Sequence, residues 1–216
     1  MPEESSHAGR TYDRIAGHFS QTREYPWPEI ESFLAGRTGA VGLDLGCGNG
    51  RHAEVLADHA DRVVGVDAST GLLAEAADRA AERGFEAELV AGDAASIPLG
   101  ADAVDLAVYV ATLHHLRPRA RRLASLDELA RVLAPGGRAL VSAWSTAHDR
   151  FVDEETGGSG LDTEIDWTLP GGETVGRFYH VYDPAEFEAD LEESDLRLLE
   201  WELSSGNCYA VVCPPE

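Results

Sequence analysis

The sequence predicts an α/β fold: a doubly wound, mostly parallel seven-stranded sheet with an antiparallel C-terminal hairpin. Short apolar runs alternate with helical patterns along the first two thirds of the chain, an order typical of one parallel sheet with helices on both faces. The run 41–45 leads into a glycine-rich turn at 46–50, as where a buried strand turns sharply into a helix. Near the end, the apolar runs 196–203 and 208–213 are separated by Ser-Gly-Asn, which indicates a hairpin.

The N-terminal part is expected to be helical after a short tail. Residues 1–10 are polar and acidic, and we expect them to be disordered. A helical pattern begins at Thr11, and Pro26-Trp27-Pro28 interrupts it before a second helix that runs to about Arg37. At 216 residues the chain suits one substantial core, so we expect residues 11–216 to form a single domain.

The elements of the sheet follow in order. Ser69 is a suitable N-cap for an alanine-rich helix, which Gly84 ends. Pro135-Gly136-Gly137 breaks the helix after the fourth strand. The expected strands are 41–45, 62–67, 86–91, 104–110 and 138–144, and the expected helices are 51–60, 69–83, 119–133 and 184–193.

Residues 145–176 differ in character from the rest of the chain. They are rich in Gly, Thr, Asp and Glu and show little periodicity. We expect an inserted loop or lid near the substrate. A disordered acidic loop without a role is an equal alternative.

The composition is strongly acidic. The net charge is −22, and all 17 basic residues are arginine. Such a surface stays hydrated in molar salt, where repulsion is screened, so we expect a halophilic source; chance or an acidic partner-binding face are the alternatives. Nucleic acid would be repelled except at a local basic patch.

Cysteine usage and hydropathy limit the class of protein further. Cys47, Cys208 and Cys213 are too few and too badly spaced for a disulfide framework or a zinc site, so we expect no metal. No apolar signal region or membrane span is present, and we expect a cytoplasmic protein with no membrane contact.

Three acids stand at the ends of the first three strands: Asp44, Asp67 and Asp93. A carboxylate just before the glycine turn would repel pyrophosphate but suits a cofactor with an ammonium and a sulfonium, so a dinucleotide-binding Rossmann domain is the weaker alternative. In this order the motifs resemble the Rossmann-like class I methyltransferases that use S-adenosylmethionine and release S-adenosylhomocysteine. The resemblance implies that Asp67 accepts from both ribose hydroxyls and Asp93 from the adenine amino group. The implied cofactor-binding residues are Tyr12, Asp44, Gly46, Cys47, Gly48, Asp67, Ala68, Asp93 and Ala94.

The segment after the fourth strand limits which chemical group can be the methyl acceptor. It lacks the Asn/Asp-Pro-Pro-aromatic box of amino methylation and the Pro-Cys nucleophile of pyrimidine-ring methylation, which favours an oxygen acceptor. His114 and His115 lie where sulfur and acceptor should meet, either as packing residues or as a base. A local positive field follows, and ion pairing along the next helix is its alternative explanation. Its members are Arg117, Arg119, Arg121 and Arg122.

A more specific resemblance covers nearly the whole chain. The N-terminal box from Tyr12 to Arg23 with Pro26-Trp27, Leu113-His114-His115 with Arg121-Arg122, the box from Arg177 to Tyr182, and Gly206-Asn207-x-Tyr209 are similar to the family that methylates carboxymethyluridine at the tRNA wobble position. Cys208 departs from it, standing where that family has an aromatic residue. The resemblance implies a tRNA substrate, with the four arginines of the local positive field as nucleic-acid contacts.

The acceptor implied by this family is a carboxylate, ionised at neutral pH since a carboxyl pKa is about 4, so it needs no general base. Arg23 and Arg177 would orient it, because guanidinium grips carboxylate in a planar fork. Tyr179, His180 and His114 would add donors. Asn207 would hold the base or ribose, and Tyr12 would cover the cofactor.

The same resemblance implies a heterodimer with a small zinc-finger-like activator subunit that adds a strand to the sheet. Strand 86–91, an edge strand by analogy with this fold, is the available partner. Two other functions stay open. One is a small-molecule (quinone or metabolite) O- or C-methyltransferase, and the other is a non-catalytic cofactor-binding scaffold.

Overall fold

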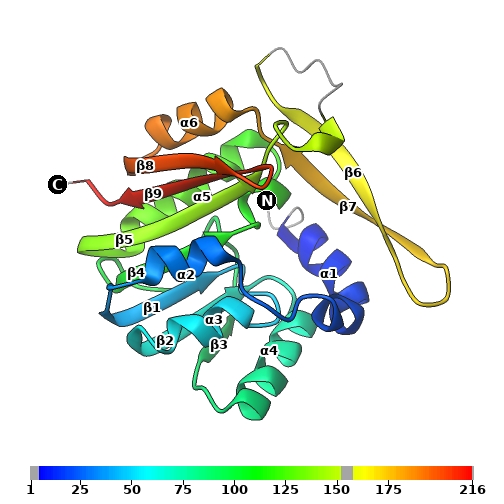
Figure 1. Cartoon of the computed structure of the whole chain (residues 1–216), viewed down its shortest axis with the longest axis horizontal. Coiled ribbons are helices and arrows are strands. Elements are labelled where there is room, and N and C mark those ends of the chain that lie inside the picture. The colour runs from blue at the N-terminus through cyan, green and yellow to red at the C-terminus, as the bar shows by residue number, and fades with distance from the viewer. Residues whose placement is uncertain (1–4, 152–157, 216) are drawn as a thin grey trace.

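The main element of the protein is a seven-stranded sheet in the order β3-β2-β1-β4-β5-β9-β8, seen here in a computed structural model that describes residues 5–151 and 158–215 (Figure 1). Strands β3 to β5 of this order are parallel, and β9 and β8 are antiparallel, which confirms the predicted fold class. The strands are β1 (Gly39–Leu45), β2 (Ala60–Asp67), β3 (Glu88–Ala91), β4 (Val104–Val110), β5 (Leu133–Trp144), β8 (Arg197–Ser204) and β9 (Asn207–Cys213). As expected, β3 lies at one edge.

Helices cover both faces of the sheet. On one face, α5 (Arg119–Val132) and α6 (Pro184–Glu193) bury Leu126, Leu129 and Phe187 against the strands. On the other, α2 (Pro28–Leu34) and α3 (Arg51–Leu56) bury an equivalent apolar set. Complete burial of such a side chain is worth about 1.5–3 kcal/mol, so the two layers fix the sheet between them.

The caps expected from the sequence set the ends of α4 (Thr70–Arg83). The Ser69 hydroxyl accepts a hydrogen bond from the Leu72 amide at 3.1 Å, and Gly84 ends the helix with φ of 75°. This helix packs beside α1 (Ser5–Gln21) and contacts β2 and β3.

The glycine turn after β1 brings two strand ends close together. Gly46 has φ of 73°, and a Cβ at this position would lie 2.1 Å from the Thr112 Oγ1. Only glycine therefore lets the turn pack against the segment that follows β4. The ends of β1 and β4 become neighbouring walls of one cleft.

Two parts of the chain differ from expectation. Helix α1 begins at Ser5 rather than Thr11. The expected irregular insert at 145–176 instead contains a short helix, η2 (Asp149–Phe151), and most of a two-stranded sheet, β6 (Leu161–Thr168) with β7 (Thr174–Val181). Residues 1–4 and 152–157, which also carried expectations of disorder or a loop, lie outside the described residues.

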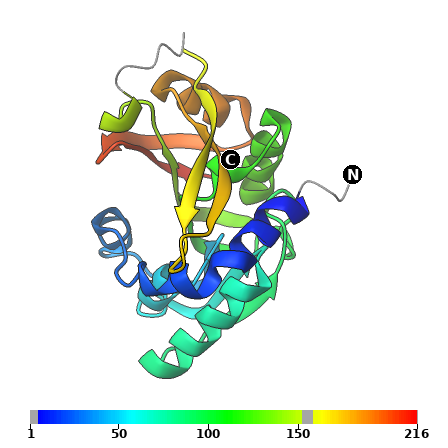
Figure 2. The same ribbon diagram turned by 90° about the vertical axis from the view of Figure 1, so that its right-hand side faces the viewer.

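The β6–β7 hairpin and α1 lie side by side, away from the main sheet (Figures 1 and 2). The Trp167 indole N–H donates to His18 Nδ1 at 3.0 Å, and Arg14 pairs with Glu173 at 2.7 Å near the hairpin tip. Over the described ranges, no helix has the length and apolar character needed to cross a membrane.

Candidate active site

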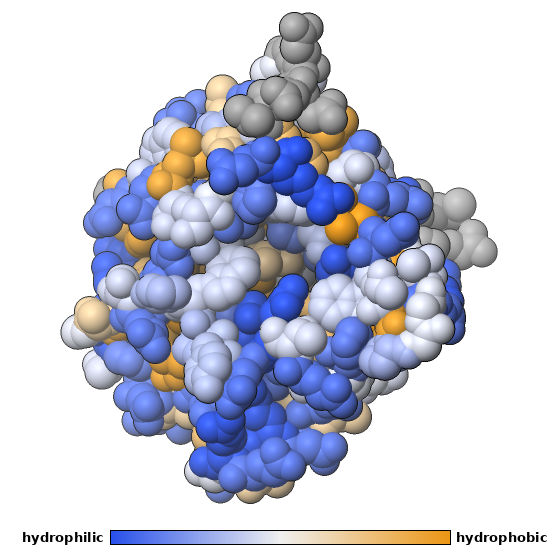
Figure 3. All heavy atoms as spheres, turned by 45° about the vertical axis from the view of Figure 1, so that its right-hand side comes forward, coloured by the Kyte–Doolittle hydropathy of each residue, from blue (hydrophilic) through white to orange (hydrophobic). Residues whose placement is uncertain are grey.

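A cleft opens at the carboxyl ends of the parallel strands, beneath α1 and the hairpin. It encloses about 1250 Å³, part of it open to solvent. Figure 3 shows a hollow in this side of the molecule. Its walls come from α1, from the segments that follow β1 to β4, and from β7. This is the edge at which doubly wound sheets bind their ligands.

The structure gathers the residues expected to bind the cofactor around this cleft. Those that line it are Tyr12, Gly46, Cys47, Gly48, Asp67, Ala68, Asp93 and Ala94. Asp44, the remaining member of the expected set, lies behind the glycine turn and is 1% exposed.

Asp44 is a buried carboxylate that forms no ion pair with a described residue. Neither of its oxygens has a hydrogen-bond partner among the described residues. Burial raises the pKa of Asp44 to about 7, and the Asp67 charge adds to the effect, while the nearby Ala53 amide and the Arg51 charge oppose it. A cationic group bound at the glycine turn would compensate the buried negative charge of Asp44, so the site suits a ligand that carries positive charge.

Asp67 already shapes the turn that it faces. Its Oδ2 accepts from the Gly48 amide at 2.8 Å, and its Oδ1 accepts from the Ser69 amide at 2.8 Å. Burial raises its pKa, and these amides oppose the rise. Asp67 thus connects the end of β2 to the glycine turn and reaches the cleft wall.

Asp93 is engaged by an arginine that was expected to contact RNA. Its Oδ2 accepts from Arg121, and its Oδ1 accepts from the Ala95 amide at 3.0 Å. The expected role of Arg121 in nucleic-acid binding is therefore not supported, since its charge is neutralised inside the cleft wall.

The other three arginines of the local positive field differ in their ion pairs and in their exposure. Arg119 pairs with Asp190 and Glu193 at 2.7 and 2.6 Å, so its charge is also matched. Arg122 is 4% exposed and cannot reach RNA at all. Only Arg117, of these four, is exposed without an ion pair to a described residue; it lies 4.7 Å over the Phe178 ring at the cleft mouth.

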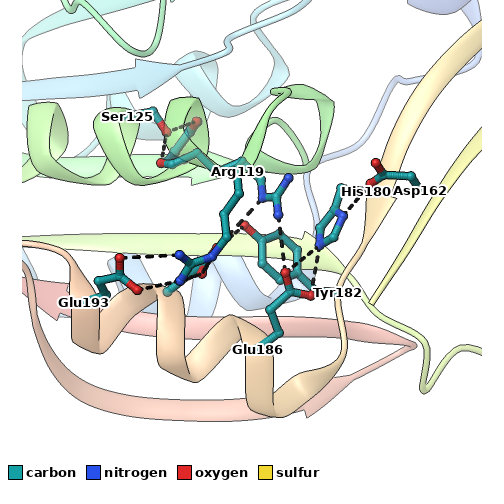
Figure 4. Close-up of polar contacts among 10 residues, drawn as sticks. Arg119, Ser125, Asp162, His180, Tyr182, Glu186 and Glu193 are labelled. Atoms are coloured by element: carbon teal, nitrogen blue, oxygen red, sulfur yellow. Dashed lines mark hydrogen bonds and ion pairs between the residues drawn. The ribbon is translucent and has the colours of Figure 1, made fainter. Parts of the chain in front are cut away.

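His180 belongs to a buried ionic network and not to the cleft (Figure 4). Its Nδ1 lies 2.6 Å from an Asp162 carboxylate oxygen and its Nε2 lies 3.0 Å from a Glu186 carboxylate oxygen. Glu186 in turn pairs with Arg122 at 3.3 Å. The expected role of His180 as a donor to substrate is not supported by its position, because carboxylates on both sides of the ring occupy both nitrogens.

Arg23 and Arg177, expected to orient the acceptor, come together on one tryptophan. Their guanidinium carbons lie 5.5 and 4.7 Å from the Trp167 ring centre. Arg177 lines the cleft, is 8% exposed, and its Nε has no hydrogen-bond partner among the described residues. Neither arginine pairs with a described carboxylate. Cations that stay unpaired beside a cleft in a protein of net charge −22 are suited to an anionic ligand.

The two histidines after β4 are held neutral. The Trp144 amide donates to His114 Nδ1 at 2.9 Å, and burial lowers the pKa of His114 well below its usual value. His115 donates from Nδ1 to the Phe178 carbonyl at 2.8 Å and accepts at Nε2 from the Tyr12 hydroxyl at 2.9 Å. Burial lowers the pKa of His115 to about 4. His115 lines the cleft, whereas His114 lies behind it, packed on Tyr179.

Tyr179 and Asn207 do not line the cleft. Tyr179 is 8% exposed and packs against both histidines and Trp144, so it supports the wall. Asn207 donates to the Ser205 carbonyl at 3.2 Å in the β8–β9 turn. The expected direct roles of Tyr179 and Asn207 toward the substrate are therefore not supported by their positions.

Comparisons with known proteins identify the family. Residues 43–137 match the methyltransferase domain family model. The tRNA (carboxymethyluridine(34)-5-O)-methyltransferase of Schizosaccharomyces pombe is 34% identical, with 96% of each chain covered. The chain belongs to this methyltransferase family. The tRNA (carboxymethyluridine(34)-5-O)-methyltransferase alkbh8 of Xenopus tropicalis is 42% identical over 66% of this chain, but the chain spans only about a fifth (22%) of that relative.

Solved structures show the same fold. The DhpI–SAM–HEP complex superposes with a TM-score of 0.73 at 23% identity and covers 99% of this chain and 100% of that one. A complex between the Haloferax volcanii Trm112 methyltransferase activator and a putative methyltransferase gives 0.69 at 16%, covering 97% and 98%. The name of the first complex includes SAM, the cofactor that the sequence predicts for this chain.

Several residues in or beside the methyltransferase cleft were not expected from the sequence. Trp167 lies in the segment thought to be irregular, and its alternation with Asp166 and Thr168 is a strand signal. His115 was considered only beside His114, although the structure places it in the cleft wall. Arg51 follows the glycine turn directly, but a single arginine at a helix start carries no distinctive pattern.

Proposed function

We propose that this methyltransferase transfers the methyl group of S-adenosylmethionine to the carboxylate of a 5-carboxymethyluridine-type wobble base of tRNA. The names of the relatives support this substrate. The observation that carries it is the pair Arg23 and Arg177 on Trp167, two cations beside the cleft without a described counterion. A small neutral acceptor has no use for them.

The chemistry suits a site without a free base. The cofactor supplies an electrophilic methyl group on a positively charged sulfur. A carboxylate oxygen attacks that carbon, the carbon–sulfur bond breaks, and the products are a methyl ester and a neutral thioether, with no proton to remove. His115 matches this requirement, because both of its nitrogens are hydrogen-bonded and its pKa is lowered to about 4. Arg177 in the cleft wall, together with Arg23 on the same tryptophan, would hold the carboxylate in line.

The cofactor would lie along the strand ends in the order of the sheet. Asp93 after β3 is assigned to the adenine amino group and Asp67 at the end of β2 to the ribose hydroxyls. Gly46 and Gly48 provide the close backbone approach, and the uncompensated Asp44 charge fits the ammonium and sulfonium. Tyr12, hydrogen-bonded to His115, would close the cleft over the ligand.

RNA would approach at the Arg117 side of the mouth. Arg117 is exposed and stacks on Phe178, so it can receive a phosphate or a base. The remaining surface is acidic, and we propose that either high salt, as in a halophilic cell, or a partner subunit limits the repulsion.

A small activator subunit is the proposed partner, in line with the Trm112 complex of the Haloferax volcanii neighbour. Among the described strands, the edge strand β3 pairs with β2 alone and leaves Leu89 and Val90 half-buried. Leu89→Lys should abolish co-purification with the activator. Leu203→Lys on β8, an exposed apolar position at the opposite edge, is the control and should leave co-purification intact. Equal retention in both variants would contradict docking on β3.

The function is tested by labelled methyl transfer to tRNA. With the activator present, tRNA that carries 5-carboxymethyluridine should become labelled, and mild alkali should release the label as methanol, because the product is an ester. Unmodified uridine at the same position should give no label. Alkali-stable label, or equal label on both tRNAs, would contradict the proposal.

A further inference from the structure

Arg51, the first residue of α3, is a buried cation whose role is not explained by the fold. It is 9% exposed and stacks 5.3 Å from the Trp27 ring centre. Its guanidinium donates a long hydrogen bond of 3.4 Å to the Tyr25 carbonyl, and no described carboxylate lies within ion-pair distance. Burial, together with the nearby Arg23, lowers the pKa of Arg51 to about 10. Desolvation without a counterion disfavours the charged form, so the fold alone gives little reason for an arginine here.

The neighbourhood of Arg51 points into the cleft. Arg51 and His52 both line it, on the side of the glycine turn. His52 is 4% exposed, and its Nε2 has no hydrogen-bond partner among the described residues. Asp44 lies close enough to influence the charge on Arg51, and its oxygens are also unpartnered. One end of the cleft therefore offers an unpaired guanidinium and an unpaired ring nitrogen, and an unpartnered carboxylate lies just behind the glycine turn.

The order of the strands indicates which ligand group reaches this end. Asp93 and Asp67 stand at the ends of β3 and β2, and β1 with its glycine turn is next in the sheet. A ligand whose adenosine lies along β3 and β2 would thus extend its amino-acid end over the β1 turn. That end carries an ammonium and a carboxylate, the complement of Asp44 and Arg51.

We infer that Arg51 binds the carboxylate of the cofactor's amino-acid end. Arg51 would thus bind a different ligand group from Arg23 and Arg177. Those two arginines lie on Trp167 and are proposed to bind the substrate anion. The inference rests on the cofactor and not on the proposed RNA substrate, so a failure to methylate tRNA leaves its test intact.

Calorimetric binding of two cofactor products provides the test. S-adenosylhomocysteine has the amino-acid end, whereas 5′-methylthioadenosine has the same adenosine and sulfur without it. Arg51→Gln should lower the affinity for S-adenosylhomocysteine by about 10- to 100-fold, the effect of losing a charged hydrogen-bonded pair. The affinity for 5′-methylthioadenosine should change by less than about threefold. Arg51→Lys should recover part of the loss, since the charge remains but the planar fork does not.

Arg79→Gln is the matched control. It removes the same formal charge nearby, from a side chain that pairs with Glu54 at 2.6 Å and does not line the cleft. Both ligands should bind this variant as they bind the wild type. All measurements use the protein in the form that binds S-adenosylhomocysteine, with the activator where it is required.

Three outcomes would overturn the inference. Equal weakening of both ligands by Arg51→Gln would show that the arginine only shapes the turn. Unchanged binding of both would show that it contacts neither. Unchanged S-adenosylhomocysteine binding with weaker tRNA binding would assign Arg51 to an RNA phosphate instead.

Discussion

Replacing Arg177 by glutamine removes a buried cation that lines the cleft. The side chain is 8% exposed, has no described counterion, and is held by the faces of Trp167 and Tyr179 at 4.7 and 5.2 Å. Glutamine keeps hydrogen-bonding capacity but loses the charge and the fork. The variant therefore separates recognition of an anion from simple filling of the wall.

The expected magnitude follows from the contacts. A charged hydrogen bond to a carboxylate contributes about 1.5–3 kcal/mol, which corresponds to a loss of about 10- to 150-fold in kcat/KM. The acceptor loses its negative charge as the ester forms, so Arg177 holds the substrate more strongly than the transition state. The loss in kcat/KM should therefore appear as a higher KM, with kcat not lowered. Two cation–π contacts favour the native arginine, but its desolvation opposes them, so the free energy of unfolding should change by less than about 1 kcal/mol.

Steady-state methylation of tRNA that carries 5-carboxymethyluridine, with S-adenosylhomocysteine affinity and denaturant unfolding measured in parallel, checks this expectation. Arg131→Gln is the matched control. Arg131 pairs with Glu128 at 2.6 Å and donates to the Leu99 carbonyl at 2.9 Å, away from the cleft, so its loss should lower stability and leave KM unchanged. A kcat/KM for Arg177→Gln within threefold of wild type would refute the role of Arg177 in holding the acceptor.

Three further expectations concern the buried charges. Asp67→Ala should lower the affinity for S-adenosylhomocysteine, measured by calorimetry, by at least about tenfold. The substitution removes the proposed ribose contact and the 2.8 Å hydrogen bond from the Gly48 amide. The pKa of Asp44 is raised from about 4 when unfolded to about 7, so the ligand-free fold holds more protons and its stability should fall as pH rises from 4 to 7. Asp44→Asn should flatten that dependence in thermal unfolding and weaken S-adenosylhomocysteine at pH 8; an unchanged slope would contradict the burial argument. Arg122→Gln leaves the buried Asp190 partly uncompensated and should destabilise the fold by about 3–5 kcal/mol in denaturant unfolding. A stable variant with a selective loss of RNA binding would instead restore the RNA role first expected for Arg122.

The parts of the fold that the sequence predicted well are those with strong local signals. The glycine turn needs positive φ at Gly46, and the cap at Ser69 and the stop at Gly84 follow from side-chain and backbone preferences alone. The acids Asp44, Asp67 and Asp93 could be placed at one edge because parallel strands end together.

The parts that the sequence did not predict depend on which distant elements meet. The acidic alternation in β6 resembles a solvated loop until Trp167 is seen to pack on α1 and the arginines. His180 and Arg122 are polar residues in promising motifs, but the packing of α6 against α5 turns both into members of one buried ionic network. No local pattern distinguishes a cation that binds a ligand from one that pairs with an acid far away in the chain.

The most direct test of the central claim is the affinity of anticodon stem-loops for the methyltransferase saturated with S-adenosylhomocysteine. Arg23 and Arg177 should make the stem-loop that carries the free carboxymethyl acid bind at least tenfold more tightly than its methyl ester, and Arg177→Gln should abolish most of this preference. Equal affinities of the wild-type protein for acid and ester would contradict the claim that these cations recognise the negative charge of the acceptor.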